Sequence, residues 1–280
     1  MSSAAAAPAS PPTFETIAVQ VDGPVGRLTL DRPEHLNPIS TDTLVELADA
    51  AHWFDRHSSA TIVVVSGAGR AFSSGADLAA LGPRTDGEAD GGGGQRSSMP
   101  RWRHAEAGRR MADAVERMRQ VTIAAIRGHC VGGGVVLASV CDMRVATTSA
   151  RFVIPETALG IPLTWGGVPR LVREIGPAMT RELVMTCRPF DGAEAKDIGF
   201  VNRAVPDDEL DTAVAELVAS LVDKSPYTLE VTKHHLRALA EEMVGAGRSF
   251  ADADSLVTAT SDPASREVGR AYLDRFRSRR

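Results

Sequence analysis

Two short glycine-containing segments have the residue types needed to stabilise a developing negative charge. The first, residues 71–77, reads AFSSGAD, and the second, residues 132–134, is a triple glycine. Each follows a buried strand pattern and leads into a helix. Helix N-termini expose unpaired N–H groups with a partial positive charge, and small residues let a ligand approach that backbone closely. Two such ends facing each other would form an oxyanion hole, where one donor can contribute about a hundred- to a thousandfold in rate.

Neither segment is diagnostic by itself, because a triple glycine is more often only a tight turn. A phosphate-binding loop is disfavoured, since neither segment continues into Gly-Lys-Ser/Thr. A dinucleotide site is also disfavoured, since neither segment has the GxGxxG spacing. The pairing of the two segments is therefore the informative feature.

The elements that must position these segments alternate between strands and helices. The runs 61–65 and 121–126 are continuous and apolar or β-branched, which predicts strands covered on both faces, as in a parallel sheet. The pattern predicts further strands within 15–30, 144–146 and 150–153, and helices at 41–51, 103–119, 135–140, 192–199, 208–223, 225–246 and 263–277. Strands alternating with helices and followed by a helical tail indicate an α/β layered fold.

Composition limits the classes of protein that this chain can belong to. A chain of 280 residues can bury a sizeable core without disulfides, and its three cysteines have no zinc-binding spacing. We interpret these cysteines as small buried hydrophobes in a reducing, cytoplasmic protein. The net charge of -5 argues against a nucleic-acid-binding surface, and no run reaches the roughly 18 apolar residues of a membrane span.

The chain divides into a tail, a core and a helical end. Residues 1–13 are rich in Ala, Pro and Ser, which predicts a disordered tail and not a signal peptide. Residues 14–205 form the predicted core. Within it, residues 82–100 are rich in glycine and acids, which predicts a mobile loop. Residues 206–280 form the helical C-terminal region.

These motifs together resemble the crotonase (enoyl-CoA hydratase/isomerase) superfamily. The similar segments are LDRP at 30–33 with LN at 36–37, GRAFSSGAD at 69–77, IAAIRG at 123–128 with GGG at 132–134, PE at 155–156, AEA at 193–195 and GFV at 199–201. The resemblance covers roughly residues 15 to 278. It implies a spiral of ββα repeats with a helical C-terminal trimerisation region, assembled as a homotrimer or a dimer of trimers. It also implies an acyl-CoA substrate, with no separate cofactor and no metal.

The resemblance also implies site residues. The oxyanion donors would be the N–H groups of Ser74 and Gly133. The implied substrate-binding residues are Gly75, Ala76, Asp77, His35, Tyr272 and Arg275. Of these, Tyr272 and Arg275 would reach the CoA of a neighbouring subunit. Trp165, which stands where family hydratases usually have small residues, is a further candidate for substrate binding.

One of the two glutamates expected of a family hydratase is absent. The first would follow the triple glycine at position 136, which is Val136 here, whereas the second is present as Glu156. A single carboxylate can move a proton from the α carbon of a thioester to another carbon, and an apolar pocket would raise its proton affinity. The resemblance therefore favours isomerisation of a 3-enoyl-CoA to a 2-enoyl-CoA.

Several alternatives remain at this stage. The chain could be a hydratase with weak or atypical acids, or a non-catalytic acyl-CoA-binding protein, and Glu156 could be a solvated carboxylate. Neither Val136 nor Thr164 supplies an aspartate like that of the family's dehalogenases. Trp165 could reshape the acyl pocket or simply pack in the core. We expect His129 to be packed and hydrogen-bonded, and Asp142 to tie down a turn.

Overall fold

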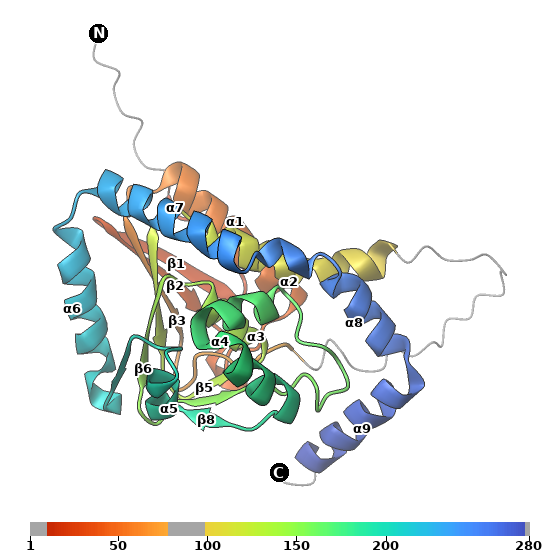
Figure 1. Ribbon diagram of the computed structural model, residues 1–280. Helices are drawn as coiled ribbons and strands as arrows, with labels where there is room; N and C mark the ends of the chain where they lie inside the picture. The colour runs from red at the N-terminus through yellow and green to blue at the C-terminus, as the bar shows by residue number, and fades with distance from the viewer. Residues whose placement is uncertain (1–9, 78–98, 278–280) are drawn as a thin grey trace.

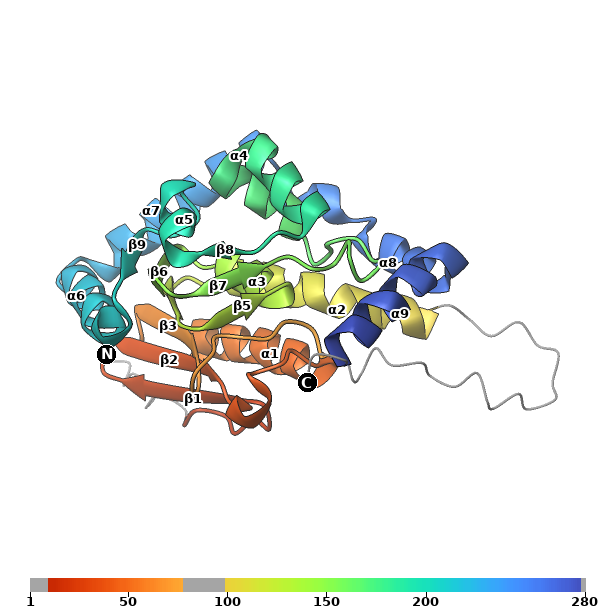
Figure 2. The ribbon, with the colours of Figure 1, turned by 90° about the horizontal axis from the view of Figure 1, so that it is seen from below.

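The computed structural model describes residues 10–77 and 99–277 as two sheets surrounded by helices (Figure 1, Figure 2). In these ranges one sheet has six strands in the order β1-β2-β3-β4-β6-β9, and the other has three in the order β5-β7-β8. Strands β1 and β2 pair antiparallel, as do β7 and β8, and the remaining pairs are parallel. The strands are β1 (Ile17–Asp22), β2 (Val25–Leu30), β3 (Ile62–Gly67), β4 (Val121–Ile126), β5 (His129–Val131), β6 (Met143–Thr147), β7 (Arg151–Val153), β8 (Phe190–Asp191) and β9 (Arg203–Val205).

The helices follow the strands and dominate the C-terminal third of the chain. They are α1 (Thr41–His57), α2 (Met99–Glu116), α3 (Gly133–Ser139), α4 (Gly167–Thr186), α5 (Gly192–Asp197), α6 (Leu210–Val222), α7 (Pro226–Met243), α8 (Asp252–Ser261) and α9 (Pro263–Arg277). Figures 1 and 2 place α8 and α9 at the side of the molecule away from α6. Among the helices of the described ranges, none combines the length and the apolar character that crossing a bilayer requires.

The larger sheet is covered on both faces, which explains the continuous apolar runs in its sequence. Side chains alternate across a strand, so Ile62 and Val64 of β3 face α6, whereas Val63 and Val65 face the main core. On the outer face, α6 contributes Leu210 and its apolar neighbours Ala213, Val214 and Leu217. The prediction of doubly covered parallel strands at 61–65 and 121–126 is therefore confirmed.

Other elements differ from the prediction in their bounds or in their number. Residues 15–30 form a hairpin of two strands that turns at Gly23, not one strand. The helix predicted at 103–119 spans Met99–Glu116, and α8 was missed. Ser40 caps α1 as its sequence suggested, because its Oγ accepts the N–H of Thr43. Of the predicted tail and loop, residues 1–9 and 82–98 lie outside the described residues.

Asn37 joins the segment after β2 to the segment after β3. Its side chain lies in a site that is 1% exposed, where Nδ2 donates to the carbonyls of Ala68 at 2.9 Å and Ala71 at 2.8 Å. Its Oδ1 accepts the N–H of Arg32 at 3.0 Å. Its backbone is left-handed, with φ of 55°, a conformation that Asn adopts more readily than most residues. These bonds hold the start of segment 71–77 against residues 32–37.

We expect Asn37→Ala to lower the free energy of unfolding by about 2–3 kcal/mol, because it leaves buried backbone groups without partners. Urea unfolding followed by circular dichroism measures the loss. The matched control is Asn202→Ala, since Asn202 is exposed and its Oδ1 accepts only the N–H of Arg144 in the described structure. That control should cost about 1 kcal/mol or less. Equal losses in the two variants would contradict the assigned role of Asn37.

Candidate active site

Segment 71–77 is held along both of its edges by backbone hydrogen bonds. On one edge, Ser73 donates to His129 and accepts from Val131, which joins the segment to β5. On the other edge, Ile39 donates to Gly75 and accepts from the N–H of Asp77. The segment is thus an extended strip whose direction is set by two neighbours distant in sequence.

The second glycine segment begins α3 beside this strip. Gly132 has φ of 49° and donates its N–H to the carbonyl of Val153 at 2.8 Å, and α3 starts at Gly133. A Cβ at Gly132 would lie 2.4 Å from Oε1 of Glu156, and the positive φ also favours glycine there. The first N–H groups of a helix have no partner within the helix, so the N–H of Gly133 is available to a ligand.

A cavity of about 80 Å³ lies where these elements meet. It is lined by the start of α1, the strip 71–77, helices α2, α3 and α8, and the loop after β7. Ala76, Gly133 and Glu156 all face it. The predicted donors' segments and the predicted base are therefore brought together at one site.

The structure changes which residue of the strip can act as a donor. The N–H of Ser74 donates to the carbonyl of Leu36 at 2.8 Å, so it is not available to a ligand. Ile39 makes both hydrogen bonds of a parallel bridge, one to each residue that flanks Ala76. The residue between these two bonds directs its own N–H to the opposite side. Ala76 holds that position opposite Ile39, and it lines the cavity, whereas Ser74 does not. The structure therefore favours Ala76 over the predicted Ser74 as the donor from this segment.

The Glu156 carboxyl group is buried beside the triple glycine. Its Oε2 is inaccessible to solvent and has no hydrogen-bond partner among the described residues. Burial raises the pKa of Glu156 from 4.5 to about 7, because ionisation would place a charge in an apolar site. The alternative that Glu156 is a solvated carboxylate is therefore wrong.

Comparison with known proteins identifies the family. The model of the family described as enoyl-CoA hydratase/isomerase matches residues 21–278. The chain belongs to the enoyl-CoA hydratase/isomerase family. It is 35% identical to the peroxisomal Delta(3,5)-Delta(2,4)-dienoyl-CoA isomerase of Arabidopsis thaliana over 239 residues, which cover 85% of this chain and 86% of the relative. It is 29% identical to the crotonyl-CoA hydratase of Syntrophomonas wolfei over 264 residues, which cover 94% of this chain and 96% of the relative.

Solved structures agree with this assignment. A Thermobifida fusca protein described as an enoyl-CoA hydratase, solved in complex with CoA, is 32% identical, with a TM-score of 0.71 over 96% of this chain and 98% of that chain. The prediction of a crotonase-type α/β fold is confirmed. Both isomerases and hydratases of the family are among the relatives, so the family alone leaves the reaction open.

The position where family hydratases have their first glutamate carries an apolar side chain that faces the cavity. Val136 is fully buried on α3 and lines the cavity. The other carboxylate among the lining residues is Asp77, which pairs with Arg32 at 2.9 Å. Thr164 also lines the cavity and has no acid–base capacity near neutral pH. Glu156 is therefore the lining carboxylate with a raised pKa.

The other residues predicted to bind substrate lie at different distances from the cavity. Ala76, Asp77 and Trp165 line it, and Gly75 lies next to Ala76 in the strip. His35 is exposed, and its carbonyl accepts a hydrogen bond from Oγ of Ser74. Whether these residues contact a CoA thioester stays a prediction.

The two C-terminal residues lie on α9, outside the cavity lining. Burial raises the pKa of Tyr272, and the neighbouring Cys187 thiol and Glu156 carboxyl add to this effect. Tyr272 thus lies near the Glu156 region of its own chain, while Arg275 is exposed. A role of either residue at a neighbouring subunit stays a prediction.

Two expectations about other polar residues have different outcomes. Asp142 accepts hydrogen bonds from the N–H and the Oγ1 hydroxyl of Thr122. It also forms an ion pair with Lys233, so it links β4 to α7. His129 is exposed on β5, and the expectation that it would be packed is wrong. Its exposure follows from its place at the edge of the short strand, with its side chain directed away from the core.

Sequence reasoning missed several cavity residues on helices, among them His104 and Leu256. His104 of α2 lines the cavity and pairs with Thr41 Oγ1, at 3.1 Å from Nδ1. Leu256 of α8 also lines it. Neither has a motif around it, and the amphipathic pattern of α2 shows only which side faces the core. Their positions depend on where α2 and α8 dock, which local sequence does not reveal.

The raised pKa of Glu156 has a consequence for stability. Below about pH 4.5 the carboxyl is protonated in both the folded and the unfolded chain. Between 4.5 and about 7 the unfolded chain releases this proton while the folded chain keeps it, so stability falls as pH rises through this window. We therefore expect the free energy of unfolding of Glu156→Gln, measured relative to that of wild type, to be about 2–3 kcal/mol higher at pH 8 than at pH 5.

Denaturant unfolding at the two pH values measures this difference. The matched control is Glu216→Gln, which removes an exposed carboxylate on α6, far from the cavity lining. Its effect on stability should not change between pH 5 and pH 8. If Glu156→Gln behaved in the same way, the assigned pKa would be wrong.

Proposed function

We propose that this chain binds an acyl-CoA thioester in the cavity and stabilises its enolate, with Glu156 as the single base. The supporting observation is the buried carboxyl group, whose Oε2 has no partner among the described residues and whose pKa is about 7. A group with this pKa is half ionised at neutral pH, so it can both accept and return a proton. The CoA complex of the Thermobifida relative supports a CoA thioester as the ligand.

In the proposed mechanism, the thioester oxygen accepts hydrogen bonds from the N–H groups of Ala76 and Gly133. Ionised Glu156 removes a proton from C2, and the electron pair of the broken C–H bond moves onto the thioester oxygen. The two N–H groups stabilise the resulting oxyanion. The position of both residues in the cavity lining supports this assignment.

The favoured reaction is the isomerisation of a 3-enoyl-CoA to a 2-enoyl-CoA. Glu156 takes the proton from C2, the negative charge spreads over a dienolate, and the same proton is returned at C4. The double bond moves from C3–C4 to C2–C3, and no water is consumed. Val136 offers no second acid for activating water, and the similarity to the Arabidopsis dienoyl-CoA isomerase supports a double-bond shift.

A homotrimer or a dimer of trimers remains the proposed assembly. The exposed apolar side chains of Leu236, Leu239 and Met243 on α7 support it, because an exposed apolar patch of this kind is typical of a protein interface.

The direct test is exchange of α protons when a saturated acyl-CoA is incubated with the protein in heavy water. Nuclear magnetic resonance should show exchange in wild type and a loss of about 100- to 10,000-fold in Glu156→Gln, because the base is removed. The exchange rate at saturating ligand should rise with pH and level off above about 7, where Glu156 is ionised.

The control Glu216→Gln should exchange at the wild-type rate, since this side chain is exposed on α6. Exchange that persists in Glu156→Gln would show that another group is the base. Binding of acyl-CoA without exchange in wild type would instead favour a non-catalytic binding protein.

A hydratase is the second candidate, favoured by the 29% identity to the Syntrophomonas crotonyl-CoA hydratase over 94% of this chain. Val136→Glu would place a second carboxylate in the lining. We expect it to raise hydration of crotonyl-CoA by at least about tenfold, because a second group for activating water contributes about 10²- to 10⁴-fold when well positioned. Loss of the absorbance of the conjugated double bond in the enoyl thioester measures hydration. Val136→Gln is the control, because glutamine has the shape of glutamate without its acid–base capacity. Strong hydration by wild type would contradict the single-base proposal.

A further inference from the structure

Trp165 has a backbone conformation that a bulky residue rarely adopts. Its φ is 61°, and the following Gly166 has φ of 68°. The left-handed region is unfavourable for a large side chain, and such residues persist only where the surrounding structure determines them. Conformations of this kind are concentrated at ligand sites.

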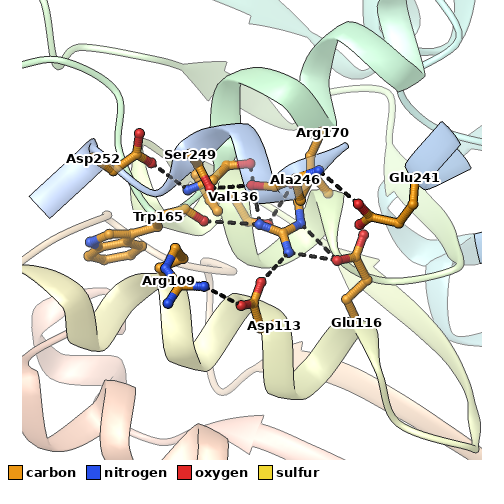
Figure 3. Close-up of polar contacts among 12 residues, drawn as sticks. Arg109, Asp113, Glu116, Val136, Trp165, Arg170, Glu241, Ala246, Ser249 and Asp252 are labelled. Carbon is orange, nitrogen blue, oxygen red and sulfur yellow. Dashed lines mark hydrogen bonds and ion pairs between the residues drawn. The ribbon is translucent and has the colours of Figure 1, made fainter. Parts of the chain in front are cut away.

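A polar network around the buried Arg170 fixes the backbone at the Trp165 carbonyl and at Gly166 (Figure 3). Nη1 of Arg170 donates to the carbonyls of Trp165 at 3.1 Å and Gly166 at 3.3 Å. The N–H of Gly166 donates to Oδ2 of Asp252 at 2.8 Å. Arg170 itself is 1% exposed and is paired with Asp113 at 2.9 Å and Glu116 at 2.6 Å. The turn is thus held by α4 on one side and α8 on the other.

The indole fills a gap between two helices that glycine leaves open. A Cβ at Gly108 of α2 would lie 2.0 Å from Cδ1 of Trp165, and a Cβ at Gly133 of α3 would lie 2.2 Å from its Cζ3. Glycine in the interior of a helix is unfavourable relative to alanine, so Gly108 is explained by the ring that lies against it. The ring is therefore confined between α2 and the start of α3.

The same indole is a wall of the cavity. The apolar lining beside it includes Ile161, Leu163 and Leu256. The cavity volume is about 80 Å³, well below the roughly 300–1,000 Å³ of pockets that enclose drug-sized ligands. A cavity of this size favours a short acyl group over a long one.

We infer that Trp165 determines specificity by occupying the part of the cavity beside Gly133, which restricts the substrate to short acyl groups. This inference rests on the proposed function for the identity of the ligand as an acyl-CoA. A longer chain meets an indole that cannot move aside, because Gly108 and Gly133 confine the ring and Arg170 and Asp252 hold its backbone.

The test is to measure by calorimetry the binding of saturated acyl-CoAs whose acyl groups have about 4, 6, 8, 10 and 12 carbons, a series from short to long chains. For wild type, we expect the 10-carbon ligand to bind at least about tenfold more weakly than the 4-carbon ligand, a difference that corresponds to about 1.4 kcal/mol. Trp165→Leu should remove this difference, and Trp165→Phe should reduce it by less. The control Trp53→Phe, in the α1 tryptophan outside the cavity lining, should keep the wild-type profile.

Gly108→Ala supplies the second arm of the test, because its new methyl group would overlap the indole. We expect it to push the ring into the cavity and weaken even the 4-carbon ligand by about tenfold or more. In Gly108→Ala/Trp165→Leu the overlap is gone, so the double variant should match Trp165→Leu. Circular dichroism confirms that each variant is folded. An unchanged profile in Trp165→Leu, or no effect of Gly108→Ala, overturns the inference.

Heavy-water exchange on the same ligands separates this inference from the proposed function. A length limit without exchange leaves Trp165 as the determinant in a binding protein and overturns the catalytic proposal. Exchange at equal rates from 4 to 12 carbons supports the catalytic proposal and overturns the length limit. Absence of binding by every acyl-CoA overturns both.

Discussion

The site depends on the strip of chain that follows β3 being bonded along both edges. Ser73 pairs with β5 on one side, and Ile39 pairs with the strip on the other. Backbone bonds of this kind leave little freedom in the direction of the remaining N–H groups, so the orientation of Ala76 follows from the pairing of its neighbours. Asn37 adds three side-chain bonds at the start of the strip. A donor positioned in this way needs no reorganisation when charge develops.

The distribution of buried charge explains why Glu156 is different from the other acids around it. The Arg170 guanidinium lies between Asp113 and Glu116, and Lys233 pairs with Asp142. In those pairs each charge offsets the cost of burying the other. Oε2 of Glu156 has no such partner among the described residues, so burial outweighs a backbone hydrogen bond to this carboxyl group and favours the protonated form. A single fold thus pairs some buried acids with a cation and leaves Oε2 of Glu156 without a partner in the described part of the chain.

Local sequence predicts elements well where one structural cause dominates. The runs 61–65 and 121–126 became parallel strands because helices and the core cover both faces of the sheet. The sequence pattern was less informative where the position of an element depends on how it packs against other elements. Helix α8 has no strong signal of its own, yet it supplies Leu256 to the cavity and Asp252 to the Trp165 turn. His129 is in an apolar segment but faces outward at the end of a short strand.

The sequence by itself determined the family, the α/β fold class, and the presence of one glutamate and one valine at the two acid positions. These are properties of residue type and spacing, which need no knowledge of distant neighbours. Only the tertiary structure decided that Ala76 and not Ser74 has an available N–H, because Leu36 accepts the bond from Ser74. Only the tertiary structure raised the pKa of Glu156 and confined Trp165 against Gly108, because burial and close contact arise between segments far apart in the chain.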